Sequence, residues 1–147
     1  MSSRSRVFLT LDANVFVAAL KADEPYSDKC LEILSQVPER FVLVEPSIVY
    51  VEVLGALVRR VGVELAEKAK VELDRMMNPL LVVACNREFC LKAYSLCHEY
   101  NVYAVDSLYL ETALEAESIL VSLDKEDFVE RIKMKSPPIE VRHVSEF

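Results

Sequence analysis

Two aspartates each follow directly on a short apolar run typical of a buried β-strand. Asp12 comes after residues 7–11, Val-Phe-Leu-Thr-Leu, and Asp124 comes after residues 119–123, Ile-Leu-Val-Ser-Leu. In open α/β sheets, ligands bind beyond the carboxyl ends of the strands. Because both aspartates stand at such an end, we expect their carboxylates to meet at one edge of a sheet.

Two further acids are isolated among apolar neighbours. Glu52 is the only charged residue between Ser47 and Val58, and Asp106 lies in the apolar segment 102–110. A buried, unpaired carboxylate is strongly destabilising unless a cation or hydrogen-bond donors accompany it. Both residues are therefore expected to face a cation or a polar cleft.

The four acids together predict a metal site. Four like charges at one sheet edge repel one another without a counterion, and Lys125, next to Asp124, is the only basic residue directly beside any of them in the sequence. Hard carboxylate ligands suit Mg²⁺ or Mn²⁺, which acidify a bound water for attack on phosphorus. Helix capping stays open as an alternative for each aspartate, whereas Glu52 falls past the cap position of its helix.

Short apolar runs alternate with amphipathic segments along the chain. We expect strands at residues 7–11, 41–44, 80–84, 119–123 and 139–144. Helices are expected at 14–22, 26–37, 47–61 (with Ser47 as the N-cap), 63–77, 88–100, 105–117 and 125–133. The alternation predicts an α/β fold, a three-layer α/β/α sandwich with a mostly parallel sheet, in a single domain of residues 1–147.

Composition limits the possible classes of protein. The net charge of −7 argues against binding nucleic acid by broad electrostatics, although bound metal would neutralise part of it in a nuclease. Apolar stretches are too short for a membrane span, and Asp12 interrupts the first one, so we expect a cytoplasmic protein. The four cysteines lack zinc spacing and are expected to be buried free thiols: Cys30, Cys85, Cys90 and Cys97.

The acids and their surroundings resemble the PIN-domain ribonucleases, especially the VapC-type toxins of toxin–antitoxin pairs. The resemblance rests on Leu11-Asp12-Ala13-Asn14, Val51-Glu52-Val53, Asp106-Ser107-Leu108-Tyr109 and Leu120-Val121-Ser122-Leu123-Asp124, followed by Asp127-Phe128. The motifs occur in the family's order and cover almost the whole chain. Ser107 and Ser122 stand where alanine and threonine are common, and no acid is missing.

The resemblance implies residue roles and partners. Asp12, Glu52, Asp106 and Asp124 would be the catalytic metal ligands. Polar groups beside them would be Asn14 and Ser122, whereas Asp127 would orient a water or cap a helix. The family implies endonucleolytic cleavage of RNA, a homodimer and often a small antitoxin protein that blocks the groove.

Binding surfaces are less clearly marked. Arg59 and Arg60 end the Glu52 helix and are candidates for holding RNA, as is the basic run of Arg131, Lys133 and Lys135; ordinary solvated charge is the alternative for both. Residues 48–58 are apolar around most of a helix, which indicates burial or a subunit interface. We therefore expect a dimer.

Three other functions remain open. A haloacid-dehalogenase-like phosphatase needs a second aspartate two residues after the first, where this chain has Asn14. A receiver-like module needs an aspartate after a middle strand, where Cys85 and Asn86 stand. A PIN fold that has lost catalysis and binds only partners would retain the fold without needing the acids.

Overall fold

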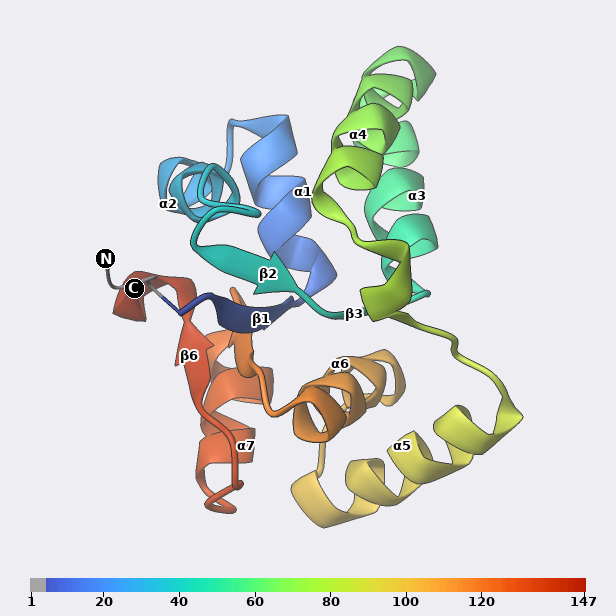
Figure 1. The fold of residues 1–147 in the computed structure, drawn as a ribbon, viewed down its shortest axis with the longest axis vertical. Helices are drawn as coiled ribbons and strands as arrows, with labels where there is room; N and C mark the ends of the chain where they lie inside the picture. Colours follow the sequence, from blue (N-terminus) through green and yellow to red (C-terminus); the bar gives the residue numbers. More distant parts are fainter. Residues whose placement is uncertain (1–4) are drawn as a thin grey trace.

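The computed structural model describes residues 5–147, and its centre is a parallel sheet. Its strands are β1 (Val7–Leu11), β2 (Phe41–Leu43), β5 (Ile119–Ser122) and β6 (Val141–His143), in the order β2-β1-β5-β6. The two central strands are β1 and β5, paired with Leu11 opposite Val121. All the pairs in this sheet are parallel, as predicted (Figure 1).

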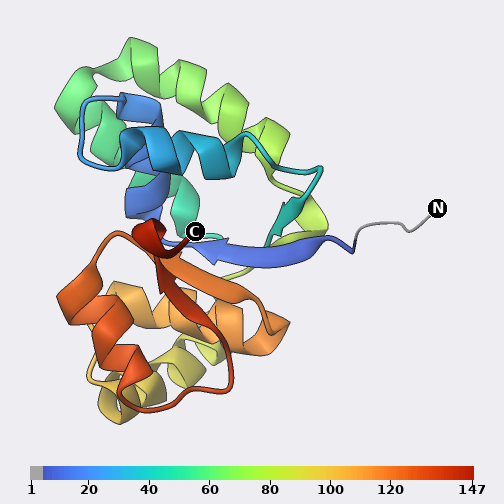
Figure 2. The same cartoon turned by 90° about the vertical axis from the view of Figure 1, so that its left-hand side faces the viewer.

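Helices cover both faces of the sheet and make the predicted three-layer sandwich. One layer contains α1 (Ala13–Lys21), α2 (Ser27–Leu34), α3 (Val49–Val61) and α4 (Val63–Met76). The other contains α5 (Arg87–Tyr100), α6 (Ala104–Ala116) and α7 (Arg131–Lys133). Figure 2 shows the sheet between these two layers.

The core is built from the periodicities that the sequence displays. Leu9 and Leu11 of β1 are fully buried, and α3 buries Val49, Val53 and Leu57 at four-residue spacing. Burying each such aliphatic side chain contributes about 1.5–3 kcal/mol, which holds the helices against the sheet. The rest of the α3 surface is only partly buried, so the helix is not enclosed on all sides within this chain.

The predicted strand at residues 80–84 is largely wrong. Residues Pro79–Leu81 form a 3₁₀ turn, and only Val82–Val83 form a strand, β4, which pairs with β3 (Glu45–Pro46) outside the main sheet. Leu80 is 91% exposed, so the apolar run does not enter the core. Apolar composition alone cannot distinguish a core strand from an exposed turn.

The predicted cap at Ser47 is also wrong. Helix α3 begins at Val49 with Ile48 in the N-cap position, and no side chain caps it. The hydroxyl of Ser47 instead accepts a hydrogen bond from the Cys85 main-chain N–H at 3.1 Å. Ser47 therefore joins the start of α3 to the segment after β4.

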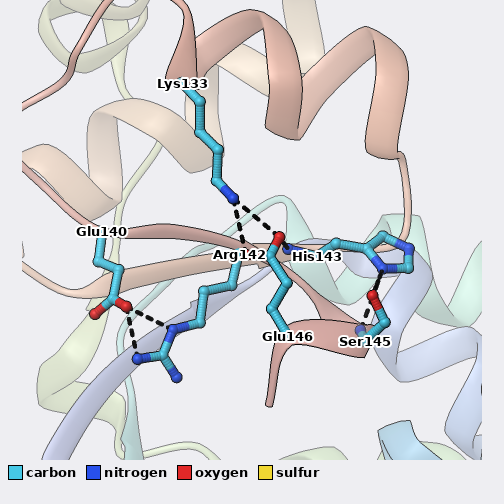
Figure 3. A network of polar contacts seen from close by, with 6 residues as sticks. All are labelled: Lys133, Glu140, Arg142, His143, Ser145 and Glu146. Carbon is cyan, nitrogen blue, oxygen red and sulfur yellow. Dashed lines mark hydrogen bonds and ion pairs between the residues drawn. The ribbon is translucent and has the colours of Figure 1, made fainter.

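The C-terminal part departs from a regular helix and then closes onto the sheet. A π-helical turn, η2 (Lys125–Glu130), precedes the short α7, and β6 continues into a 3₁₀ turn, η3 (Val144–Glu146). Figure 3 shows Lys133 Nζ donating to both carboxylate oxygens of Glu146 at 2.9 Å, while Glu146 also accepts from the His143 N–H. This network ties α7 to the chain end.

The cysteines match the expectation in one respect only. All four are free thiols, but only Cys30 is buried, and Cys90 is exposed.

Within residues 5–147, no helix combines the length and the apolar character needed to cross a membrane.

Candidate metal centre

Asp12 lies where β1 ends beside β5. Its main-chain N–H donates to the Val121 carbonyl at 2.9 Å, which extends the β1–β5 pairing by one residue. The side chain is only 7% exposed, and its Oδ2 accepts a hydrogen bond from Ser122 Oγ at 2.8 Å. Asp12 occupies the N-cap position of α1 without any side-chain capping bond, so the capping alternative is wrong for this residue.

Ser122 and Asn14 connect the carboxyl ends of the two central strands. Ser122 Oγ accepts hydrogen bonds from Asn14 Nδ2 at 3.2 Å and from the Asp124 N–H at 3.0 Å, while donating to Asp12. The Asn14 amide oxygen accepts from the Leu123 N–H at 3.2 Å. These two polar residues therefore contact the side chain of Asp12 and the main chain at Leu123 and Asp124.

Glu52 is held from α6 by Tyr109, a residue of the third motif to which the sequence analysis gave no role. The hydroxyl of Tyr109 donates to Glu52 Oε1 at 2.7 Å, and the Tyr109 side chain is fully buried. Burial, with the nearby Glu45 charge, raises the pKa of Tyr109 far above its usual range. The hydroxyl therefore keeps its proton and stays a donor to the carboxylate.

Asp106 and Asp124 approach from α6 and from the start of η2. Asp106 lies in the first turn of α6. The N-cap residue of this helix is Tyr103, so Asp106 does not occupy the cap position. Asp124 Oδ1 accepts from the Asp127 N–H at 3.1 Å, so Asp124 does cap the turn that follows it, as the capping alternative allowed. The side chain of Asp127 pairs with Arg131 at 2.9 Å.

Electrostatic coupling shows that the acids share one region. Burial, aided by the charges of Asp106 and Glu52 and opposed by the Ser122 hydrogen bond, raises the pKa of Asp12 from 3.8 to about 7. Burial also raises the pKa of Asp106 to about 6, aided by Asp124, Glu52 and Asp127. None of the four predicted ligands forms an ion pair within residues 5–147.

The carboxylates do not form a preassembled ligand cluster. Among residues 5–147, no three histidine, cysteine, aspartate or glutamate side chains stand close enough together to hold a metal ion. The acids instead lie within electrostatic range of one another. Their oxygen donors and uncompensated charge fit a hard divalent cation such as Mg²⁺ or Mn²⁺.

Glu45 is a buried acid that the sequence analysis missed. Its carboxyl group is fully buried, Oε1 accepts from the Leu11 N–H at 2.6 Å, and Oε2 is without a partner among the described residues. Burial raises its pKa well above 4.5, and the Asp12 charge adds to this. The sequence did offer a signal for Glu45, because it is a single acid between Val44 and Pro46. The same criterion, an acid isolated among apolar residues, identified Glu52.

The predicted basic residues differ in their surroundings. Arg60 pairs with Glu24 at 3.2 Å and borders a hollow of about 170 Å³ that Asn14 and Glu52 also line. Arg59 lines an adjacent hollow with Arg60. Arg60 therefore shares a hollow with one of the four acids, Glu52.

The basic run is already engaged in ion pairs at two positions, because Arg131 pairs with Asp127 and Lys133 pairs with Glu146.

A parallel sheet with acids at the carboxyl ends of its central strands, covered by helices on both faces, defines a class of small α/β domains with an acidic site. The sequence matches the PIN domain family model over residues 9–133, and the chain belongs to that family. Membership decides against the phosphatase and receiver alternatives. No curated protein sequence matches the chain.

Solved structures share this fold at low sequence identity. VapC20 of Mycobacterium tuberculosis, a toxin that cleaves the sarcin–ricin loop, is 15% identical, with a TM-score of 0.64 over 79% of this chain and 87% of that chain. DNA-bound VapBC of Salmonella typhimurium is 16% identical, with a TM-score of 0.67 over 95% and 99%. VapBC-1 of nontypeable Haemophilus influenzae is 19% identical, with a TM-score of 0.64 over 95% and 98%.

Proposed function

We propose that the chain is a single-domain, metal-dependent endoribonuclease that hydrolyses RNA phosphodiester bonds. The observation that carries the proposal is a group of four carboxylates that form no ion pair within residues 5–147, two of them following β1 and β5 and two of them on α3 and α6. An acidic region of this kind repels phosphate until cations neutralise it. Membership of the PIN family supports the same chemistry.

The ligands would be Asp12, Glu52, Asp106 and Asp124, holding Mg²⁺ or Mn²⁺. When bound, the metal supplies an acidified water and stabilises negative charge on the leaving oxygen. The chain's own residues position the carboxylates: Ser122 holds Asp12 at 2.8 Å, and Tyr109 holds Glu52 at 2.7 Å. Such supporting hydrogen bonds fix the orientation of ligand oxygens before substrate arrives.

A toxin role is proposed from the relatives. VapC20 is a toxin that cleaves the sarcin–ricin loop, and the Salmonella typhimurium relative is a VapBC assembly bound to DNA. We infer that this chain works as the toxin of a toxin–antitoxin pair in the cytoplasm, as a homodimer that a small antitoxin inhibits.

An apolar strip supports a protein partner for this chain. Val51 is 65% exposed and Val63 is 63% exposed, with Val58 and Val61 also uncovered along α3. Single apolar side chains are common on surfaces, whereas several on neighbouring turns of α3 and the start of α4 favour an interface. Light scattering at micromolar concentration should show a dimer, and a monomer would overturn this part of the proposal.

The test is cleavage of varied RNAs by the purified chain with Mg²⁺ or Mn²⁺, against EDTA. Asp12→Asn should abolish cleavage, whereas Asp74→Asn on the exposed face of α4 should not, because Asp74 lies outside the acidic site. Metal binding is measured separately by calorimetry. Undiminished cleavage by Asp12→Asn would refute the assignment of the site, and metal binding without any RNA cleavage would favour a PIN domain that binds only partners.

A further inference from the structure

An exposed aromatic ring stands at the start of α6, in a position where it does not help the helix. Tyr103 is the N-cap residue, makes no side-chain capping bond and is 60% exposed. Serine, threonine, asparagine and aspartate stabilise this position, because their oxygen accepts from a free helix N–H, and tyrosine does not do so. Helix stability therefore does not explain this ring.

Arg131 fixes a planar cation beside the ring. Its guanidinium donates to the Asn101 carbonyl at 3.0 Å and to Asp127 Oδ1 at 2.9 Å. Its central carbon lies 5.9 Å from the centre of the Tyr103 ring, within cation–π range. These two hydrogen bonds, donated to Asn101 and to Asp127, hold the arginine in place, so ring and cation form a preorganised pair.

This pair adjoins the candidate metal centre. Asp106 lies in the first turn of α6, three residues after Tyr103, which directly precedes that turn. Asp127, which holds Arg131, also interacts electrostatically with Asp106. A substrate whose phosphate lies at the acids would therefore place an adjoining base near Tyr103.

We propose that Tyr103 is a stacking platform for one base of single-stranded RNA beside the scissile phosphate, with Arg131 holding the adjoining edge of the site. The inference rests on the proposed nuclease function. Exposed aromatic side chains bind unpaired bases by stacking, and this contact requires no excess of positive charge. Because the chain has a net charge of −7, broad electrostatic attraction cannot supply its affinity for RNA, whereas stacking can.

The first experiment measures affinity for a short single-stranded RNA in an Asp12→Asn background, which prevents cleavage. Adding Tyr103→Ser should weaken binding by about 5- to 150-fold, the loss typical of one stacked base, while Tyr103→Phe should bind normally. Serine is a preferred N-cap residue, so thermal unfolding should show no loss of stability. The matched control is Tyr94→Ser, because Tyr94 is 72% exposed on α5.

A second experiment reports stacking directly. The chain contains no tryptophan, so Tyr103→Trp introduces a single fluorophore at the platform. Its fluorescence should be quenched by single-stranded RNA but not by an abasic ribose–phosphate oligomer of equal length. Tyr94→Trp, the matched control, should respond to neither.

The outcomes separate this inference from the proposed function. Normal RNA affinity in Tyr103→Ser, with a wild-type protein that cleaves RNA, would overturn the stacking platform and leave the nuclease intact. A change of oligomeric state in Tyr103→Ser without any loss of RNA affinity would assign the ring to a subunit interface and overturn the platform. Wild-type protein that neither binds nor cleaves RNA would overturn both proposals.

Discussion

Asp12 is expected to destabilise the metal-free protein, so replacing it should make that protein more stable. Burial raises its pKa from 3.8 to about 7, which means that the folded state holds a proton that the unfolded state has released. The contribution of Asp12 to the unfolding free energy therefore falls as the pH rises from about 4 to about 7 and is constant above that range. Asp12→Asn removes this ionisation and should remove the loss of stability.

The size of the effect follows from the shift. A rise of about 3 pH units corresponds to about 4 kcal/mol at about 1.4 kcal/mol per unit. The asparagine oxygen can still accept from Ser122 Oγ, but its buried amide N–H₂ needs a new partner, which costs about 1–3 kcal/mol. A net gain of about 1–3 kcal/mol is expected at pH 8.

The assay is urea denaturation of wild type and Asp12→Asn in EDTA, at pH values from 4 to 8. The difference between the two proteins should grow with pH up to about 7 and then stay constant, because Asp12 titrates there only in the wild type and the other acids are common to both. Adding Mg²⁺ at about 100 times its dissociation constant should raise wild-type stability by about 2.7 kcal/mol and leave the variant nearly unchanged.

The pH dependence of this difference decides the matter. A stability difference that is constant from pH 4 to 8 would show that the pKa of Asp12 is not raised in the folded protein. An Asp12→Asn variant that Mg²⁺ stabilises as much as the wild type would remove Asp12 from the ligand set.

Three further substitutions test the supporting contacts. Ser122→Ala removes the hydroxyl that contacts Asp12 and should weaken Mn²⁺ binding about 10- to 100-fold by calorimetry, and Ser122→Thr should retain affinity. Tyr109→Phe removes the hydrogen bond to Glu52 and should lower the unfolding free energy by about 1.5–3 kcal/mol in denaturant titrations. Glu45→Gln should abolish a stability loss above pH 4.5, since wild-type Glu45 keeps its proton when folded.

Each of these results could go the other way. Unchanged Mn²⁺ affinity in Ser122→Ala would mean that the hydroxyl does not orient a ligand. Unaltered stability in Tyr109→Phe would show that Glu52 finds another donor. If Glu45→Gln kept the full pH dependence of the wild type, another group would be responsible for it.

The strand and acid pattern was readable because it is local. The apolar runs before Asp12 and Asp124 predicted β1 and β5, and parallel pairing makes their carboxyl ends adjacent. No contact had to be known in advance, since the topology of a parallel sheet already brings its carboxyl ends to one edge. The PIN family match over residues 9–133 agrees with this order of motifs.

The failures occurred where a residue's role depends on a distant partner. Ser47 looks like a cap in sequence but binds Cys85, which is 38 residues away. Residues 80–84 look like a core strand, yet only Val82–Val83 pair, and they pair with the short β3. Local patterns do not carry this information, because tertiary packing overrides local preference.

The sequence by itself determined the class of fold, the placement of one aspartate after each of the two central strands, and the predominance of carboxylate oxygens among the candidate ligands. Each of these depends on residue type and local periodicity. Only the tertiary structure decided that Ser122 joins Asp12 to Asn14, that Tyr109 holds Glu52 across 57 residues, and that Glu45 lies buried beneath them. These contacts link residues far apart in the chain, and packing selects them only once the sheet and both helical layers have formed.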